Sequence, residues 1–183
     1  QADPLFIATD LLSQAEHDAI ASAVLITDSA KIADATAQAL GAQLPTLSRR
    51  EIAAASIADY GAIFIVPDIA TAVDLANRVA PEHLELQVRN PMELLGEIRH
   101  AGAVFLGPTT PEAVGDYVAG PNHVLPTAGA ARHSSALSVD NFVKMTSVIQ
   151  YSRDAFDREA EDIIHLAEVE GLDAHAQSVR LRR

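Results

Sequence analysis

The chain has 183 residues and a formal net charge of −12; 49% of its residues are hydrophobic, 4% are aromatic, and cysteine and tryptophan are absent. This length predicts one domain or slightly more, with a core built mainly from alanine, valine, leucine and isoleucine. The negative charge argues against nucleic acid and anionic membrane surfaces as partners, and the lack of cysteine excludes disulfides and thiolate metal sites.

The sequence contains no apolar run as long as a membrane span, and Gln1–Pro4 form neither a basic start nor an apolar signal core. We therefore expect a cytoplasmic protein with no nucleic acid and no membrane among its partners. Because the first residue is glutamine rather than methionine, we also expect a processed or excised piece of a longer chain.

The first hundred residues alternate between helical patterns and short apolar strands. Asp28–Ser29 and Asp68 are placed to begin two of the helices, and Gly41 to end one. Helices are predicted at residues 4–16, 30–40, 49–60 and 69–79 with a short one after Pro91, and strands at residues 23–27, 62–66, 84–88 and 103–106. Continuous apolar strands between helices are typical of an α/β fold with a parallel sheet covered on both faces.

The amino-acid composition of the chain changes after Gly107. Residues 108–138 are rich in glycine, proline, serine, threonine and alanine, with one short helical stretch near Pro111–Tyr117. A loop of this length in a compact protein is usually functional or disordered.

Helical patterns return towards the C-terminus. From Ser138 onward the chain is predicted to be helical again, through Ser152–Glu170 and then from Asp173 to the end, with Gly171 between the last two helices. We therefore divide the chain into an α/β domain at residues 1–137 and a helical C-terminal tail at residues 138–183.

The most informative run extends from Ala80 to Leu86 and reads APEHLEL. It places a carboxylate, Glu82, beside an imidazole, His83, at the junction between a predicted helix and a predicted strand. Such a pair can supply two acid/base groups with different pKa values to one cleft. The plainer interpretation is a turn whose two polar side chains lie in water.

Other polar residues have spacings of interest. Gln14 and His17 lie three residues apart on the first predicted helix, a spacing that suits two ligands of one metal ion or an ordinary polar helix end. Asp116 and His123 lie in a loop rich in glycine and proline, where they either serve a site or make local hydrogen bonds. His175 begins the last helix and reads by itself as an exposed histidine.

Four separated stretches of the chain resemble the histidinol dehydrogenase family. Ala80–Glu85 is similar to its catalytic signature, and Gly102–Pro126 to its longest signature. Leu12–His17 resembles its first metal-ligand segment, and Ala167–His175 its C-terminal segment. These stretches occur in the family's order along the whole chain.

The resemblance implies an oxidoreductase of histidine biosynthesis that converts L-histidinol to L-histidine in two NAD-dependent steps, through a bound aldehyde. His83 would take the alcohol proton as hydride leaves, and Glu82 would activate the water that attacks the aldehyde. The implied cofactors are Zn²⁺ and NAD. The implied zinc ligands are Gln14, His17, Asp116 and His175. The implied substrate contacts are Gln14, His17, His83, Asp116, His123, Glu170 and His175.

The chain departs from the family in length. It lacks a large N-terminal part that holds most of the family's NAD-binding residues, and it contains no Gly-x-Gly-x-x-Gly run. We therefore expect the C-terminal part of such an enzyme, with an incomplete Rossmann-like parallel sheet flanked by helices, and its cofactor-binding residues stay unassigned. A separate N-terminal chain is one possible complement, and the piece alone is expected to be inactive.

The resemblance also concerns assembly. In the family the C-terminal tail crosses to a second subunit, which implies a homodimer with shared active sites and makes residues 138–183 the dimerisation element. Two alternatives stay open: a non-catalytic fragment that binds zinc or substrate, and a related NAD-dependent alcohol dehydrogenase with another substrate.

Overall fold

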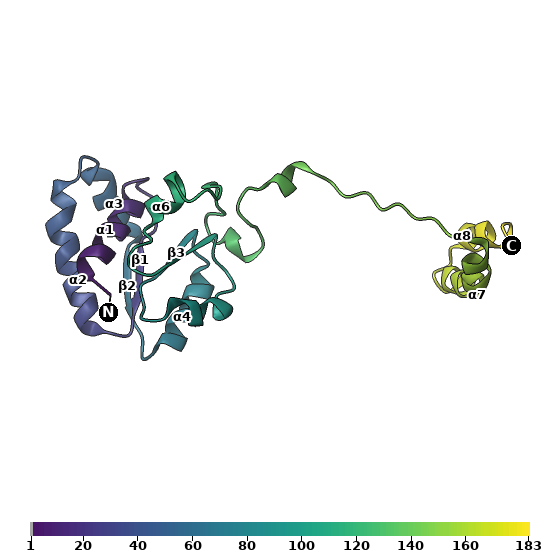
Figure 1. The fold of residues 1–183 in the computed structure, drawn as a ribbon, viewed down its shortest axis with the longest axis horizontal. Coiled ribbons are helices and arrows are strands. Elements are labelled where there is room, and N and C mark those ends of the chain that lie inside the picture. The colour runs from purple at the N-terminus through teal and green to yellow at the C-terminus, as the bar shows by residue number, and fades with distance from the viewer. Residues whose placement is uncertain (1) are drawn as a thin grey trace. The chain divides into compact units, whose positions relative to one another are not determined.

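The computed structural model describes residues 2–183, which form two units. The first unit ends at Phe142, and the second covers Val143–Arg183. Each unit is described by itself below, and Figure 1 shows their elements. Within residues 2–183, every helix is too short or too polar to span a lipid bilayer.

The first unit is an α/β structure, as predicted. Its helices are α1 (Pro4–Ala15), α2 (Ala30–Gln43), α3 (Arg50–Tyr60), α4 (Ile69–Val79), α5 (Pro91–Leu94) and α6 (Glu112–Tyr117). Short 3₁₀ turns cover Leu44–Thr46 (η1), Leu95–Glu97 (η2), Ala130–Arg132 (η3) and Val139–Phe142 (η4). Its strands are β1 (Val24–Thr27), β2 (Ala62–Ile65), β3 (His83–Leu86) and β4 (Ala103–Leu106).

The four strands form two parallel pairs. β1 pairs with β2, with Val24 opposite Ala62, and β3 pairs with β4, with His83 opposite Ala103. In each pair, helical segments connect one strand to the next, which parallel strands require. The expected parallel sheet flanked by helices is therefore confirmed, in the form of two short pairs.

Side chains cap the starts of three helices of this unit, two of them at the predicted residues Ser29 and Asp68. The Asp3 carboxylate accepts a hydrogen bond from the Leu5 amide, and Asp68 accepts one from Thr71 at 2.7 Å. The Ser29 hydroxyl accepts from the Ile32 amide at 3.4 Å, as expected for the start of α2.

The prediction that Gly41 ends α2 is wrong. The helix continues to Gln43, and the Pro45 turn η1 follows directly. A glycine ends a helix where the backbone needs a positive φ, and Gly41 is not among the residues that have one. Inside a helix, glycine costs only about 1 kcal/mol relative to alanine, so two more residues can follow it.

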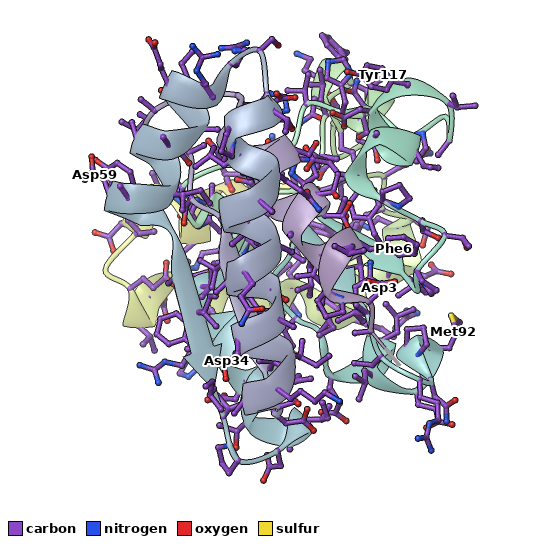
Figure 2. All side chains as sticks on the ribbon, turned by 90° about the vertical axis from the view of Figure 1, so that its left-hand side faces the viewer. Asp3, Phe6, Asp34, Asp59, Met92 and Tyr117 are labelled. Atoms are coloured by element: carbon purple, nitrogen blue, oxygen red, sulfur yellow. The ribbon has the colours of Figure 1, made fainter. Side chains whose placement is uncertain are left out.

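A core of small and aliphatic side chains joins α1 to the α2–α3 region. The buried residues are Leu12, Ala15, Ala23 and Ala53, with Leu11, Leu40, Leu44, Leu47 and Ile57 packed against them. Helices α1, α2 and α3 lie together beside β1 and β2 (Figure 1), and Asp34 of α2 and Asp59 of α3 point outwards (Figure 2). Alanine at these contacts lets the helices approach closely, which fixes the direction of α1.

The connection between β3 and β4 is held by one buried amide, Asn77 of α4. Its Nδ2 donates to the Glu97 carbonyl at 2.9 Å, and its Oδ1 accepts from the amides of Arg99 and His100 at 2.7 and 3.2 Å. The side chain is only 4% exposed. The loop before β4 is therefore tied to the helix that precedes β3.

A left-handed residue marks the end of α4. Ala80 has a φ of 54°, and its amide still donates to the Ala76 carbonyl. Pro81 follows, and the chain turns directly into β3 at His83. Across this turn, the Gly102 amide donates to the Pro81 carbonyl, and a Cβ at Gly102 would lie only 2.6 Å from the Glu82 carbonyl oxygen. Glycine is therefore required where the β4 entry passes the Glu82 backbone.

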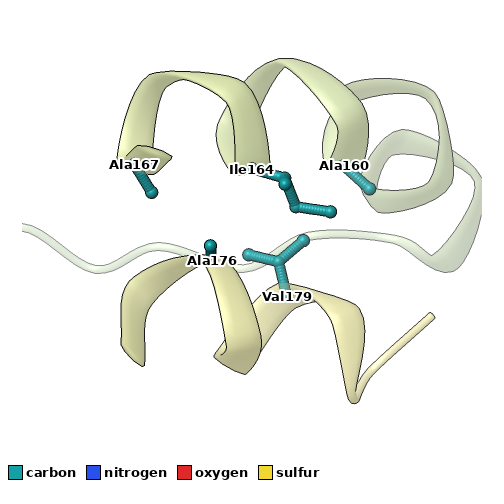
Figure 3. Close-up of a cluster of buried hydrophobic side chains, with 5 residues drawn as sticks. All are labelled: Ala160, Ile164, Ala167, Ala176 and Val179. Atoms are coloured by element: carbon teal, nitrogen blue, oxygen red, sulfur yellow. The ribbon is translucent and has the colours of Figure 1, made fainter. Parts of the chain in front are cut away.

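The second unit is a pair of helices, α7 (Arg153–Val169) and α8 (Asp173–Arg180). Gly171 lies between them with a φ of 72°, as expected for the residue that ends α7. Ala160, Ile164 and Ala167 of α7 pack against Ala176 and Val179 of α8, as Figure 3 shows. Part of the apolar stripe of α7 is thus covered within the unit itself.

The prediction of helix from Ser138 onward is wrong for most of the stretch before α7. Residues 139–142 form the 3₁₀ turn η4, and no helix or strand includes residues 143–152. Val143, Thr146, Val148 and Ile149 are β-branched, and such side chains lose rotamer freedom in a helix.

Candidate functional site

Three elements of the first unit bring polar side chains together. Gln14 lies in the last turn of α1, His83 is the first residue of β3, and Asp116 lies on α6. The Gln14 Oε1 and the His83 Nδ1 are 3.2 Å apart, within hydrogen-bond range. Residues that are 69 positions apart in sequence thus meet at one point.

Glu112, the first residue of α6, lies at the centre of this group. Its side chain is 7% exposed, and its Oε1 lies 3.6 Å from the Nδ1 of His83 and 3.9 Å from the Nε2 of His17. Donor atoms of His83, Glu112 and Asp116 all lie within 4.8 Å of one another. The sequence analysis did not single out Glu112, although its spacing of four residues from Asp116 placed both acids on one face of a helix.

Burial shifts the proton affinity of both central groups. It raises the pKa of Glu112 to about 7, and the negative charges of Asp116, Glu85 and Glu82 add to the rise. It lowers the pKa of His83, although the carboxylates of Glu82 and Asp116 oppose this shift. The neutral imidazole, which can accept a proton, is therefore favoured near neutral pH.

The second nitrogen of His83 is free to accept. Among the described residues, its buried Nε2 has no hydrogen-bond partner. The ring of Phe105 lies beside the imidazole, with centroids 5.8 Å apart and planes tilted by 47°. A buried nitrogen without a partner is costly in an ordinary structural histidine, so it marks a place where a ligand atom fits.

His17 lies close to the group, but not on the predicted helix. α1 ends at Ala15, and Glu16 is its C-terminal capping residue. Asp18 then begins a turn, in which its carboxylate accepts from the Ile20 amide at 3.1 Å. The His17 carbonyl accepts from the Arg49 guanidinium at 3.3 Å, which ties this turn to the start of α3.

Glu82 and His123 lie at the edges of the site. Glu82 is half-buried, and its carbonyl accepts from the Ala103 amide at 2.9 Å. His123 is exposed on the loop after α6 and is not part of the close group around Glu112. It does line a cavity of about 220 Å³ that also contains Asp116 and Phe105.

A second cavity, of about 210 Å³, also borders α6. His17, Arg49, Glu112 and Asp116 line it together with Ser13, Glu16, Ala113 and Tyr117. Asp116 thus lines both cavities.

The two remaining predicted site residues belong to the second unit. Glu170 is the residue directly after α7, and His175 lies on α8, as predicted. Both side chains are exposed within that unit.

The first unit therefore presents a group of donor atoms that could hold a metal ion, and the close set is His83, Glu112 and Asp116. Of the other predicted ligands, Gln14 meets this group through His83, at 3.2 Å, and His17 approaches Glu112 at 3.9 Å. Zn²⁺ accepts such nitrogen and oxygen ligands and keeps a position open for substrate in catalytic sites.

Comparison with known proteins gives a consistent result. The family model described as histidinol dehydrogenase matches residues 1–183. The histidinol dehydrogenase of Halalkalibacterium halodurans is 56% identical over 182 residues, which are 100% of this chain and 43% of that protein. That of Bacillus subtilis is 53% identical over 181 residues, which are 99% of this chain and 42% of that protein.

A solved structure also matches. The crystal structure of histidinol dehydrogenase from Elizabethkingia anophelis is 37% identical, with a TM-score of 0.93, and the match covers 99% of this chain and 42% of that one. The chain thus spans about two fifths of the length of the relatives it matches.

Proposed function

The chain belongs to the histidinol dehydrogenase family, and on this premise we propose that it supplies the acid/base and zinc-binding residues of an enzyme that oxidises L-histidinol to L-histidine. The reaction consumes one water and transfers two hydrides to NAD, through an aldehyde that stays bound. This sequence corresponds in the proposal to the C-terminal part of such an enzyme.

The observation that carries the proposal is the free Nε2 of His83. In the first step His83 accepts the proton of the substrate hydroxyl at this nitrogen while hydride leaves the carbon. The lowered pKa of His83 keeps the imidazole neutral and ready to accept. Phe105 excludes water from one side of the ring.

The second step needs an activated water. Glu82 adjoins His83 in the chain, and its half-buried carboxylate accepts a proton from water as the oxygen attacks the aldehyde carbon. Hydride then leaves the hydrated aldehyde, and the product carboxylate forms. Glu82 and His83, which have different surroundings, thus each carry out one of the two proton transfers.

The donor set described above supports zinc as a cofactor. The family resemblance supplies Gln14, His17, Asp116 and His175 as the ligands in this proposal. When bound, Zn²⁺ orients the substrate's imidazole and amine without redox chemistry of its own. NAD accepts the hydrides, and its binding residues lie mostly outside this sequence in the proposal. His123 and Glu170 contact the polar groups of the substrate.

The test uses a chain of the relatives' full length that carries this sequence. It is expected to form two NADH per L-histidinol consumed, whereas residues 1–183 alone are expected to form none. His17→Ala is expected to lower zinc content sharply in elemental analysis. Stoichiometric zinc in that variant would refute the ligand assignment, and steady NADH formation by the isolated 183-residue chain would refute the need for further sequence.

A further inference from the structure

We propose that Glu112 is a positioning residue for His83: its carboxylate holds the Nδ1–H of the imidazole, so that the Nε2 lone pair faces the substrate hydroxyl. The inference rests on the proposed function and adds a residue to it. Glu112 does not touch substrate in this proposal and acts only through His83.

The first step of the argument is the position of the carboxylate. Glu112 is a buried acid, and its Oε1 lies within 3.9 Å of a ring nitrogen of each of two imidazoles. The nearer one is His83, with Glu112 Oε1 3.6 Å from Nδ1. A carboxylate on one ring nitrogen fixes which nitrogen carries the proton.

The second step concerns the competing acceptor. The Gln14 Oε1 lies closer to the same Nδ1, at 3.2 Å. In the proposed enzyme, however, this amide oxygen is a zinc ligand. The carboxylate is then the acceptor that remains for the Nδ1–H, and a contact of 3.6 Å needs to close only slightly to become a hydrogen bond. Such contacts commonly tighten when substrate is bound.

The third step is the way in which the fold holds Glu112 in place. Its amide donates to the Glu85 carboxylate of β3 at 3.0 Å. One turn further on, Gly115 of α6 lies so close to Phe105 that a Cβ would meet the ring at 2.7 Å. Phe105 is also the ring beside His83. The helix that carries the carboxylate is therefore fixed against both strands that carry the base and its aromatic neighbour.

The kinetic test uses a full-length family chain that carries this sequence, loaded with zinc. Glu112→Gln is expected to lower kcat for alcohol oxidation about 10- to 100-fold, with an unchanged KM for histidinol. Glu112→Asp is expected to recover part of the loss. Glu97→Gln, which changes an exposed glutamate, is the matched control and is expected to behave as wild type.

A double variant separates positioning from a merely structural role. If Glu112 acts through His83, the Glu112→Gln/His83→Asn protein is expected to be as slow as His83→Asn alone, within about twofold. Losses that multiply would overturn the inference. So would a Glu112→Gln variant that raises KM while it leaves kcat unchanged.

A measurement independent of turnover keeps the inference testable even if Glu112→Gln fails to fold. Nitrogen NMR of ¹⁵N-histidine protein, with the His83 signal assigned by its absence in His83→Asn, is expected to show Nδ1 protonated and Nε2 free in the wild type. A proton on Nε2 would overturn the inference. If the wild type does not oxidise histidinol at all, the proposed function fails, and the position of the proton on His83 still tests the inference separately.

Discussion

At the scale of single residues, Glu82 and His83 share one backbone junction but face different surroundings. His83 is packed against Phe105 and Glu112, whereas Glu82 lies half-buried beside the β4 entry.

In full-length protein, Glu82→Gln is expected to slow aldehyde oxidation about 10²- to 10⁴-fold and alcohol oxidation far less, because only the second step consumes water. His83→Asn is expected to slow both steps. The two half-reactions are measured separately, with histidinol and with histidinal, and equal losses in the Glu82 variant would contradict this division.

A half-buried acid next to the site, Asp10, makes stability depend on pH. Burial raises the pKa of Asp10 from 3.8 to about 7, and the neighbouring Glu85 carboxylate adds to the rise through its charge and a hydrogen bond. Glu112 also lies close enough for the charge of Asp10 to raise its pKa. The protonation of Asp10, on α1, is thus linked to the charge of Glu85, on β3.

The sign of the pH effect follows from proton binding. Between pH 3.8 and about 7 the folded chain holds a proton on Asp10 that the unfolded chain has lost. The titration of Asp10 therefore lowers the free energy of unfolding as pH rises through this range. Asp10→Asn keeps a donor for Glu85 and removes the titration. The variant is expected to match the wild type near pH 4 and to exceed it increasingly up to pH 8 in urea unfolding. A difference that stays constant over this range would contradict the assignment.

At the scale of elements, α4 and the loop before β4 depend on each other through Asn77. Asn77→Ala removes three hydrogen bonds and leaves two amides and one carbonyl without that partner. The free energy of unfolding is expected to fall by about 1–3 kcal/mol. Asn90→Ala, whose amide donates to Glu93 on the surface, is the control and is expected to change it by less than about 0.5 kcal/mol. Equal effects of the two substitutions in denaturant unfolding would contradict the conclusion that Asn77 holds α4 and the loop before β4 together.

Elements set by local sequence are predictable, and those set by packing are not. Asp68 begins α4 and Gly171 separates α7 from α8 because each residue acts on its own neighbours. Apolar runs likewise indicate β2 and β4 almost to the residue. The end of α1 before His17 depends instead on the turn that Asp18 forms.

The same distinction applies to the candidate site. Motif resemblance selects Glu82, His83 and Asp116, and the fold of the first unit brings His83 and Asp116 together. Glu112 lies inside the Gly102–Pro126 stretch, but the resemblance gives it no role, and its burial arises only when α6 packs on Phe105. The roles of Gln14, His17, His123, Glu170 and His175 stay proposals, of which the His17→Ala and His175→Ala variants test two.

At the scale of the whole molecule, the chain combines an α/β unit that holds most of the proposed site with a helical unit that holds Glu170 and His175. On α7, Leu166 and Val169 are 63% and 72% exposed within their own unit. Exposed aliphatic side chains of this kind favour association. We propose, from the family resemblance, that two copies of the complete protein form a dimer and exchange this unit.

A complementation experiment tests whether the two subunits exchange the helical unit. Full-length Glu82→Gln and His175→Ala chains are mixed after subunit dissociation, each inactive alone. If sites are shared, each mixed dimer holds one site with both changes and one with neither, so random mixing is expected to restore about a quarter of wild-type activity. No recovery after subunit exchange has been verified by mass spectrometry would refute shared sites.

The stretch without helix or strand that precedes α7 also determines how the molecule can be divided. Lys144 lies in it, next to Met145, which is 98% exposed. An extended and accessible lysine is a preferred point for trypsin, so brief digestion of the 183-residue chain is expected to cut there first. That cut breaks no helix or strand of either unit. It cuts only the covalent link between the two units. If His175 completes a site as proposed, its unit then has to reach that site by an ordinary bimolecular encounter, which dilution suppresses.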